Sequence, residues 1–112
     1  MAVDQPNVVD IIGKNKDGEI VLTISDHLGW DDCQAHLQVL QEKINTYLTF
    51  VETGELYQKY PEARGLPVVI EVMFHYPLHS IAHAFLASAK RTVGEAGVAF
   101  RYQMFAATPF QA

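Results

Sequence analysis

Cysteine and basic side chains are scarce in this chain, which has one Cys and eight Lys and Arg against 13 Asp and Glu. A single cysteine excludes an intramolecular disulfide and a zinc-finger framework, and it suits a reducing compartment. The net charge of −5 argues against a nucleic-acid surface, because binding phosphates requires clusters of basic residues. We therefore expect an acidic protein with no nucleic-acid partner.

Long apolar runs are also missing, since no stretch of about 18 apolar residues occurs that would span a membrane. The first ten residues, MAVDQPNVVD, lack the charged and apolar regions of a secretory signal. Hydrophobic residues make up 49% and charged residues 19%, which is typical of a globular domain. We expect one cytoplasmic domain over residues 1–112, with loose tails at 1–6 and 106–112 and no membrane partner.

The stretch from Ser25 to Gly54 contains the longest predicted helix. Its apolar residues recur at helical spacing and form one stripe: Cys33, Leu37, Leu40, Ile44, Tyr47, Leu48 and Val51. Asp31 and Asp32 are expected in the first turn, where the helix dipole favours negative charge, and Gly54 is expected to end the helix. Val39 and Phe50 share a flank that either widens the core face or forms a small exposed patch.

The remaining elements follow from period-two patterns and breakers. Val8 to Ile12 and Glu19 to Ser25 read as two strands of a hairpin around the turn Lys14 to Gly18. Val68 to Tyr76 and Val98 to Phe105 read as two more strands, and a second helix is predicted from about His79 or Ser80 to Glu95. Residues 55–60 are compatible with a further short turn of helix.

The order β-β-α-β-α-β predicts an α/β (α+β) fold. Right-handed crossovers between parallel strands would place both helices on one face of a four-stranded mixed sheet, giving a two-layer sandwich. The strand order 1-2-3-4 is the simplest one. The helix-free face would carry Glu71 and Arg101, which we expect to pair across neighbouring strands.

Polar and aromatic side chains follow two strands that would end at the same sheet edge. Ligands of α/β proteins tend to lie beyond the carboxyl ends of parallel strands. The residues gathered there form the one candidate ligand-binding set in the sequence: Asp26, His27, Trp30, His75, Tyr76 and His79.

Three interpretations of this set remain open. Imidazoles with a carboxylate suit a zinc or iron site, but the His79–His83 spacing lacks the Glu of H-E-x-x-H, so we assign no metal and no cofactor. An Asp–His pair suits acid–base catalysis, but no motif identifies catalytic residues, and Asp26 and His27 point to opposite faces of a strand. In the structural interpretation, Asp26 accepts backbone N–H groups, Trp30 covers the helix start and His27 is half-exposed. His36 is expected near the edge of the helix's apolar stripe, at the boundary between core and solvent.

The segments LTISDHLGW, HLQVLQEKINTYL, TFVETGELYQKYP and VVIEVMFHYP resemble a family of small bacterial proteins known as a domain of unknown function. The resemblance covers roughly residues 8–103, and the SDHLGW turn and the QEKINTYL helix are its most specific parts. It implies a compact α/β fold and a bacterial cytoplasmic setting. It supplies no activity and no catalytic residue.

The favoured function is a non-catalytic interaction module that forms a homodimer or binds a protein partner. Small acidic immunity proteins are an analogy in size and charge alone. The candidate interface combines the helix flank and the open sheet face: Val39, Phe50, Val69, Met73 and Phe105. The alternative is a small enzyme or a metal- or ligand-binding protein that uses the His and Asp residues at the sheet edge.

Overall fold

Four strands, two long helices and two short helical turns make up the described part of the chain. The computed structural model describes residues 11–76, 78 and 80–104. The elements follow one another as β1 (Ile11–Lys14), β2 (Ile20–Asp26), α1 (Cys33–Glu52), α2 (Glu55–Lys59), the 3-10 turn η1 (Pro61–Ala63), β3 (Val68–Phe74), α3 (Ser80–Glu95) and β4 (Ala99–Met104). The predicted order of strands and long helices is confirmed, and α2 fills the predicted short helical turn.

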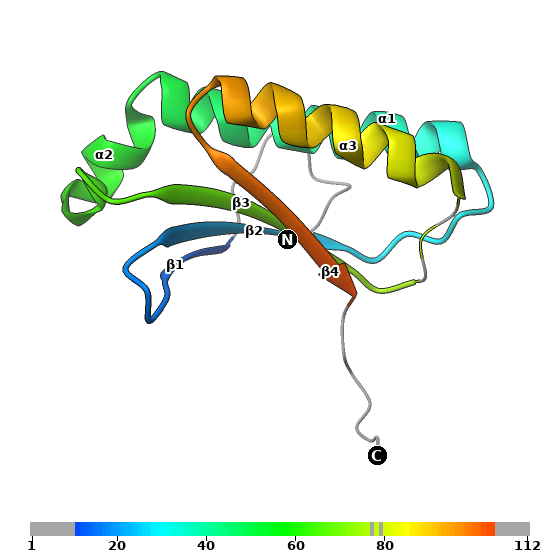
Figure 1. The fold of residues 1–112 in the computed structure, drawn as a ribbon, viewed down its shortest axis with the longest axis horizontal. Coiled ribbons are helices and arrows are strands. Elements are labelled where there is room, and N and C mark those ends of the chain that lie inside the picture. The colour runs from blue at the N-terminus through cyan, green and yellow to red at the C-terminus, as the bar shows by residue number, and fades with distance from the viewer. Residues whose placement is uncertain (1–10, 77, 79, 105–112) are drawn as a thin grey trace, which may run out of the picture.

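The strands form one mixed sheet in the order β1-β2-β3-β4. β1 pairs antiparallel with β2, whereas β2–β3 and β3–β4 are parallel. Both long helices lie on the same side of this sheet, and α2 lies at one end of it (Figure 1). The predicted two-layer α+β sandwich is therefore observed, with the simplest strand order.

Alternate residues of the central strands build the core. Ile20, Leu22 and Ile24 of β2 are buried beneath the helices, and the next residue on this face is Asp26. β3 contributes Val68, Ile70, Val72 and Phe74. Successive side chains of a strand alternate between faces, so Asp26 shares its face with the apolar core.

The buried face of α1 differs from the predicted stripe. Besides Leu40, Ile44, Tyr47 and Leu48, the residues with little or no exposure include a histidine, a lysine and the flanking aromatic: His36, Lys43 and Phe50. Cys33, Leu37 and Val51 are only half-buried. The helix thus turns its His36–Lys43–Phe50 side toward the sheet, which a hydropathy pattern misses because it counts His and Lys as polar.

Both ends of α1 are fixed by backbone chemistry. Asp32 is the N-cap rather than a first-turn residue, and its carboxylate accepts the N–H of Ala35 at 3.1 Å. At the other end, Gly54 takes a left-handed φ of 83° directly after the cap residue Thr53, as predicted, and α2 begins one residue later.

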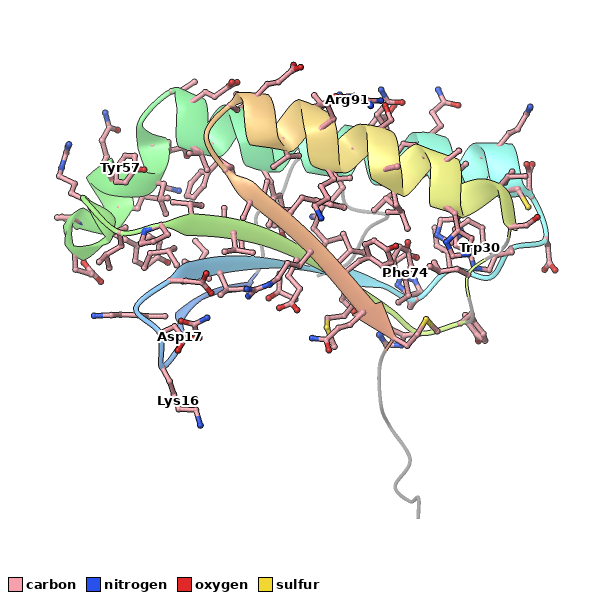
Figure 2. All side chains as sticks on the ribbon, viewed as in Figure 1. Lys16, Asp17, Trp30, Tyr57, Phe74 and Arg91 are labelled. Atoms are coloured by element: carbon pink, nitrogen blue, oxygen red, sulfur yellow. The ribbon has the colours of Figure 1, made fainter. Side chains whose placement is uncertain are left out.

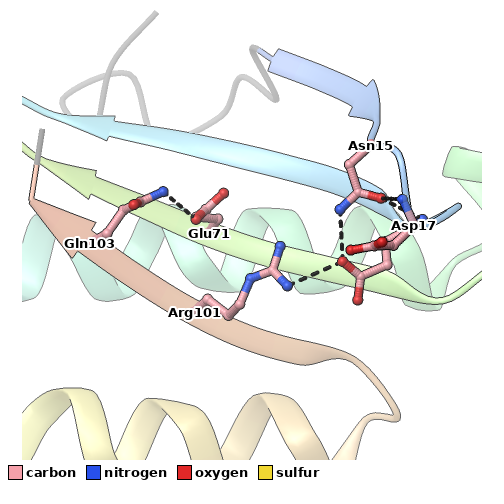
Figure 3. Close-up of polar contacts among 6 residues, drawn as sticks. Asn15, Asp17, Glu71, Arg101 and Gln103 are labelled. Carbon is pink, nitrogen blue, oxygen red and sulfur yellow. Dashed lines mark hydrogen bonds and ion pairs between the residues drawn. The ribbon is translucent and has the colours of Figure 1, made fainter. Parts of the chain in front are cut away.

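The helix-free face of the sheet carries a polar network instead of the predicted Glu71–Arg101 pair. Arg101 on β4 reaches across β3 to Glu19, with 3.1 Å between Nη1 and Oε1. Glu71 accepts instead from the amide of Gln103 at 2.7 Å (Figure 3). The register places Val69 of β3 between Glu19 and Arg101, and Val69 has no exposed surface.

Candidate functional site

The carboxyl ends of β2 and β3 meet at one edge of the sheet, as predicted. Asp26, the last residue of β2, is in register with Phe74, the last residue of β3. The N–H of His75 donates to the carbonyl of Asp26 at 2.9 Å, and this bond holds the segments that follow β2 and β3 close together. The side chains that follow these strands therefore form one local neighbourhood.

Asp26 and His36 form a buried pair in this neighbourhood. The Nε2 atom of His36 lies 2.6 Å from Oδ2 and 2.8 Å from Oδ1 of Asp26. The other ring nitrogen, Nδ1, lies 2.9 Å from the carbonyl oxygen of Gly29. Asp26 Oδ1 also accepts the N–H of Leu28 at 3.1 Å, so the predicted capping of the turn by this carboxylate is confirmed.

These contacts determine how many protons the pair holds. A carbonyl oxygen only accepts hydrogen bonds, so Nδ1 of His36 must carry a proton and donate it to Gly29. One further proton must lie between Nε2 and Asp26. Whether it sits on the imidazole or on the carboxyl group, the pair as a whole has no net charge, and burial strongly favours neutral species.

Burial changes the pKa of Asp26, the acidic member of this pair. The loss of solvation raises the pKa of Asp26, and the hydrogen bond and charge of His36 oppose that rise. The N–H of Leu28 and the nearby His27 oppose it as well. Desolvation is the largest of these influences, so Asp26 holds its proton more tightly than an exposed aspartate does.

Trp30 closes the pair off from one side. Its ring stacks on the imidazole of His36 with centroids 3.8 Å apart and planes 23° apart. Its centroid lies 6.3 Å from that of Phe74, and both residues are seen below the start of α3 in Figure 2. The thiol of Cys33 donates to the carbonyl of Trp30 at 3.3 Å. Trp30 thus covers the helix start, as the structural interpretation predicts.

The other predicted ligand residues lie apart from this buried pair. His27, His75 and Tyr76 are exposed, with 52% of the Tyr76 surface accessible. His75 Nε2 is 3.2 Å from Ser25 Oγ on the helix-free side. His79 lies outside the described residues. Within the described residues, no group of three or more His, Cys, Asp or Glu side chains is arranged to hold a metal ion.

His36 is the member of the site that the sequence interpretation placed wrongly, at the edge of the helix's apolar stripe. Its side chain is buried, with a relative exposure of 3%. A signal was present in β2: Asp26 continues the core-facing series Ile20, Leu22, Ile24, so a buried partner for its carboxyl group was required. The first turns of α1, which follows β2 after a short loop, are the nearest element that can supply this partner.

The predicted interface residues are largely internal. Phe50 has 6% and Val69 0% exposure, so neither adds surface to an interface. Val39 packs against the core, Met73 is half-buried and Phe105 lies outside the described residues. Instead, four of the five large hydrophobic side chains that are exposed in the described chain lie near the carboxyl ends of β3 and β4 or at the start of α3: Tyr76, Ile81, Tyr102 and Met104.

Comparisons with known proteins give a family but no activity. A family model described as a family of unknown function (DUF6572) matches residues 1–106. No curated protein and no solved structure matches the chain. None of the helices in the described part of the chain is long and apolar enough to cross a membrane.

Proposed function

The chain belongs to DUF6572, a family of unknown function, and we propose that it is a non-catalytic interaction module that pairs with a second copy of itself through the edge strand β4. The observation that carries this proposal is the exposure of four large apolar side chains near the carboxyl ends of β3 and β4 and at the start of α3, which we take as one cluster. Such a cluster on a small domain is typical of a protein-binding surface.

The four exposed residues share one end of the molecule. Met104 is in register with the last residue of β3, and Tyr76 follows that strand by two residues. Ile81 is the second residue of α3, which begins a few residues after β3. Between 41% and 52% of each of these side chains is exposed. Tyr102 lies on β4 itself, with its ring set edge-on to Phe74.

Among the described strands, β4 is also an edge of the sheet, and one side of its backbone pairs with no described strand. Every residue of Ala99–Met104 except Phe100 is exposed. Arg101 is the one charged residue on this strand, and its guanidinium is engaged with Glu19. Exposed edges are normally protected by Lys, Pro or a bulge, and the described β4 has no Lys and no Pro. An edge without such protection favours pairing.

Charge selects the register of the pairing. A two-fold axis at Tyr102 would set Tyr102 opposite its counterpart, Phe100 opposite Met104, and Arg101 opposite Gln103. An axis at Arg101 would set two arginines opposite each other, which is unfavourable. The Tyr102 axis gives an isologous interface in which one surface serves both copies.

The buried pair gives no support to catalysis. Both ring nitrogens of His36 are engaged, one by Gly29 and one by Asp26, so the ring has no free nitrogen to offer a substrate. Asp26 has no exposed surface through which it could act. The pair therefore fits a structural role, in which it holds the loop after β2 against α1.

The solution mass over a concentration series tests the proposal. We expect the wild-type chain to shift from monomer to dimer, and Tyr102→Lys to stay monomeric because two lysines would then face each other across the axis. Tyr60→Lys is the matched control, since Tyr60 is similarly exposed (38%) and lies outside this cluster. It should dimerise like the wild type.

A second variant guards against a folding defect in Tyr102→Lys. Gln103→Arg can keep its bond to Glu71, yet it sets a positive charge opposite Arg101 of the second copy, so it should weaken the dimer. A wild-type chain that stays monomeric at every concentration would refute self-pairing, as would a Tyr102→Lys variant that dimerises like the wild type.

One observation favours a second candidate, a small enzyme at the same sheet edge. Ser25 Oγ and His75 Nε2 are 3.2 Å apart, the reach of a nucleophile and its base. A fluorophosphonate probe, which labels activated serines, tests this candidate. Labelling that disappears in both Ser25→Ala and His75→Ala would support it, and an unlabelled wild-type chain would exclude an activated Ser25.

A further inference from the structure

We propose that the Asp26–His36 pair is a proton-operated latch: residues 27–32 are held against α1 while one proton bridges the pair, and they are released when that proton leaves. This is a conformational device in the fold and is independent of dimer formation. It joins the loop after β2 to the first turns of α1.

Three contacts make up the latch. His36 donates from Nδ1 to Gly29 in the middle of the loop, and Asp26 accepts the N–H of Leu28. The Trp30 ring stacks on one face of the same imidazole. The loop has no regular secondary structure, so its position depends on these contacts. Together they hold the loop between His36 of α1 and Asp26 of β2.

The bridging proton is what keeps the two side chains together. Without it, a buried carboxylate faces the lone pair of Nε2 at the present separations of 2.6 and 2.8 Å, and the pair acquires a negative charge. An uncompensated charge in a buried site is strongly unfavourable. The opening of the loop relieves this because it lets water reach Asp26. The raised pKa of Asp26 agrees with such a penalty on the ionised form.

Other titratable groups lie on the elements that adjoin the pair, and all of them except Lys43 are exposed. The loop itself carries His27, Asp31 and Asp32, and His75 follows β3. α3 carries His83, β4 carries Tyr102, and Lys43 lies on α1 two turns beyond His36. Lys43 is buried, with its ammonium 5.5 Å from the centre of the Tyr47 ring. Of all these groups, His27 joins His36 in acting on Asp26.

The protein contains its own reporter for the latch. Trp30 is the one tryptophan of the chain, and it stacks on the histidine in question. Contact with an imidazole quenches indole fluorescence, and exposure to water shifts the emission to longer wavelength. As the pH is raised from mildly acidic to alkaline, we expect a brighter and red-shifted emission while the far-UV circular dichroism stays unchanged.

Asp26→Asn is the decisive comparison. An asparagine amide can donate to Nε2 of His36 and still accept from Leu28, but it does not ionise, so the loop should stay closed. We expect the emission of this variant to remain flat over the pH range in which the wild type changes. All exposed histidines are retained in the variant, so they act equally on both proteins.

Two results would overturn the latch: a wild-type emission that does not depend on pH while the chain is folded, or an equal transition in Asp26→Asn. If that variant fails to fold, nuclear magnetic resonance on the wild type decides instead. The amide signal of Leu28 and the ring nitrogens of His36 should then titrate with the same midpoint as the Trp30 emission. Different midpoints would refute the latch.

Discussion

The phenol of Tyr47 on α1 donates a hydrogen bond to the carbonyl oxygen of Thr23 on β2, 2.8 Å away. Tyr47 has no exposed surface, so this bond ties the longest helix directly to a central strand. A side chain–backbone bond of this kind couples the two layers of the sandwich, in which most other contacts are apolar.

Tyr47→Phe should therefore lower the free energy of unfolding by about 1 kcal/mol, the usual net value of such a hydrogen bond. Urea denaturation measures the change. Tyr60→Phe is the control: Tyr60 is exposed, so its free energy of unfolding should stay at the wild-type value. Equal losses in both variants would contradict the role assigned to the Tyr47 hydroxyl.

His36→Leu should destabilise the fold far more, by about 3–5 kcal/mol, because it leaves Asp26 buried without its main partner. The double variant Asp26→Leu/His36→Leu should recover much of that loss, since it removes both polar groups. Unfolding experiments on the two single variants and the double variant give the coupling free energy. Additive effects would show that the pair does not act as a unit.

The pKa of Asp26 predicts a pH dependence with a definite sign. Because the pKa is raised in the folded state, the folded chain binds this proton more tightly than the unfolded chain does. The associated stability is complete below the ordinary aspartate pKa and is lost as the pH rises through the raised value. We therefore expect the wild type to lose stability relative to Asp26→Asn over that window. Urea unfolding at a series of pH values measures the difference, and the opposite trend would contradict the raised pKa.

Replacement of glycine by alanine should have opposite effects on stability at Gly54 and at Gly94. Gly54→Ala should destabilise by about 1 kcal/mol, because a φ of 83° is unfavourable for any residue with a Cβ. Gly94→Ala lies in α3 with a helical backbone and should stabilise by about 0.5–1 kcal/mol. A new Cβ meets no atom within 4 Å at either position, so thermal denaturation isolates the backbone effect. Changes of the same sign would contradict this account.

The sequence was sufficient for the architecture because that part of the fold depends on periodicity and breakers. Alternating residues in β2 and β3 and the apolar spacing in α3 each allow one assignment, and Gly18 and Gly54 sit where the chain must take a positive φ. The parallel crossovers then fix which face is covered. None of these inferences requires the position of an individual side chain.

The site was only partly predictable because it depends on the rotation of α1 about its own axis. Asp26, Trp30 and the meeting of the two strand ends were expected, but the partner of Asp26 was not. An apolar stripe defines a broad face, and His36 and Lys43 lie inside the buried face even though a hydropathy pattern places them outside it. The course of residues 27–32, which sets the position of Gly29 and Trp30, follows from contacts that no periodicity reports.

The buried bond between Asp26 and His36 also has a consequence for how the family can diverge. Substitution of either residue alone leaves the other buried without its hydrogen-bond partner, which destabilises the fold. Replacement of both by apolar residues of similar volume leaves no unpaired polar group in the core. Positions 26 and 36 should thus vary in concert among relatives, as an acid with a histidine or as two apolar residues. Two positions ten residues apart in the sequence are then expected to change together rather than one at a time.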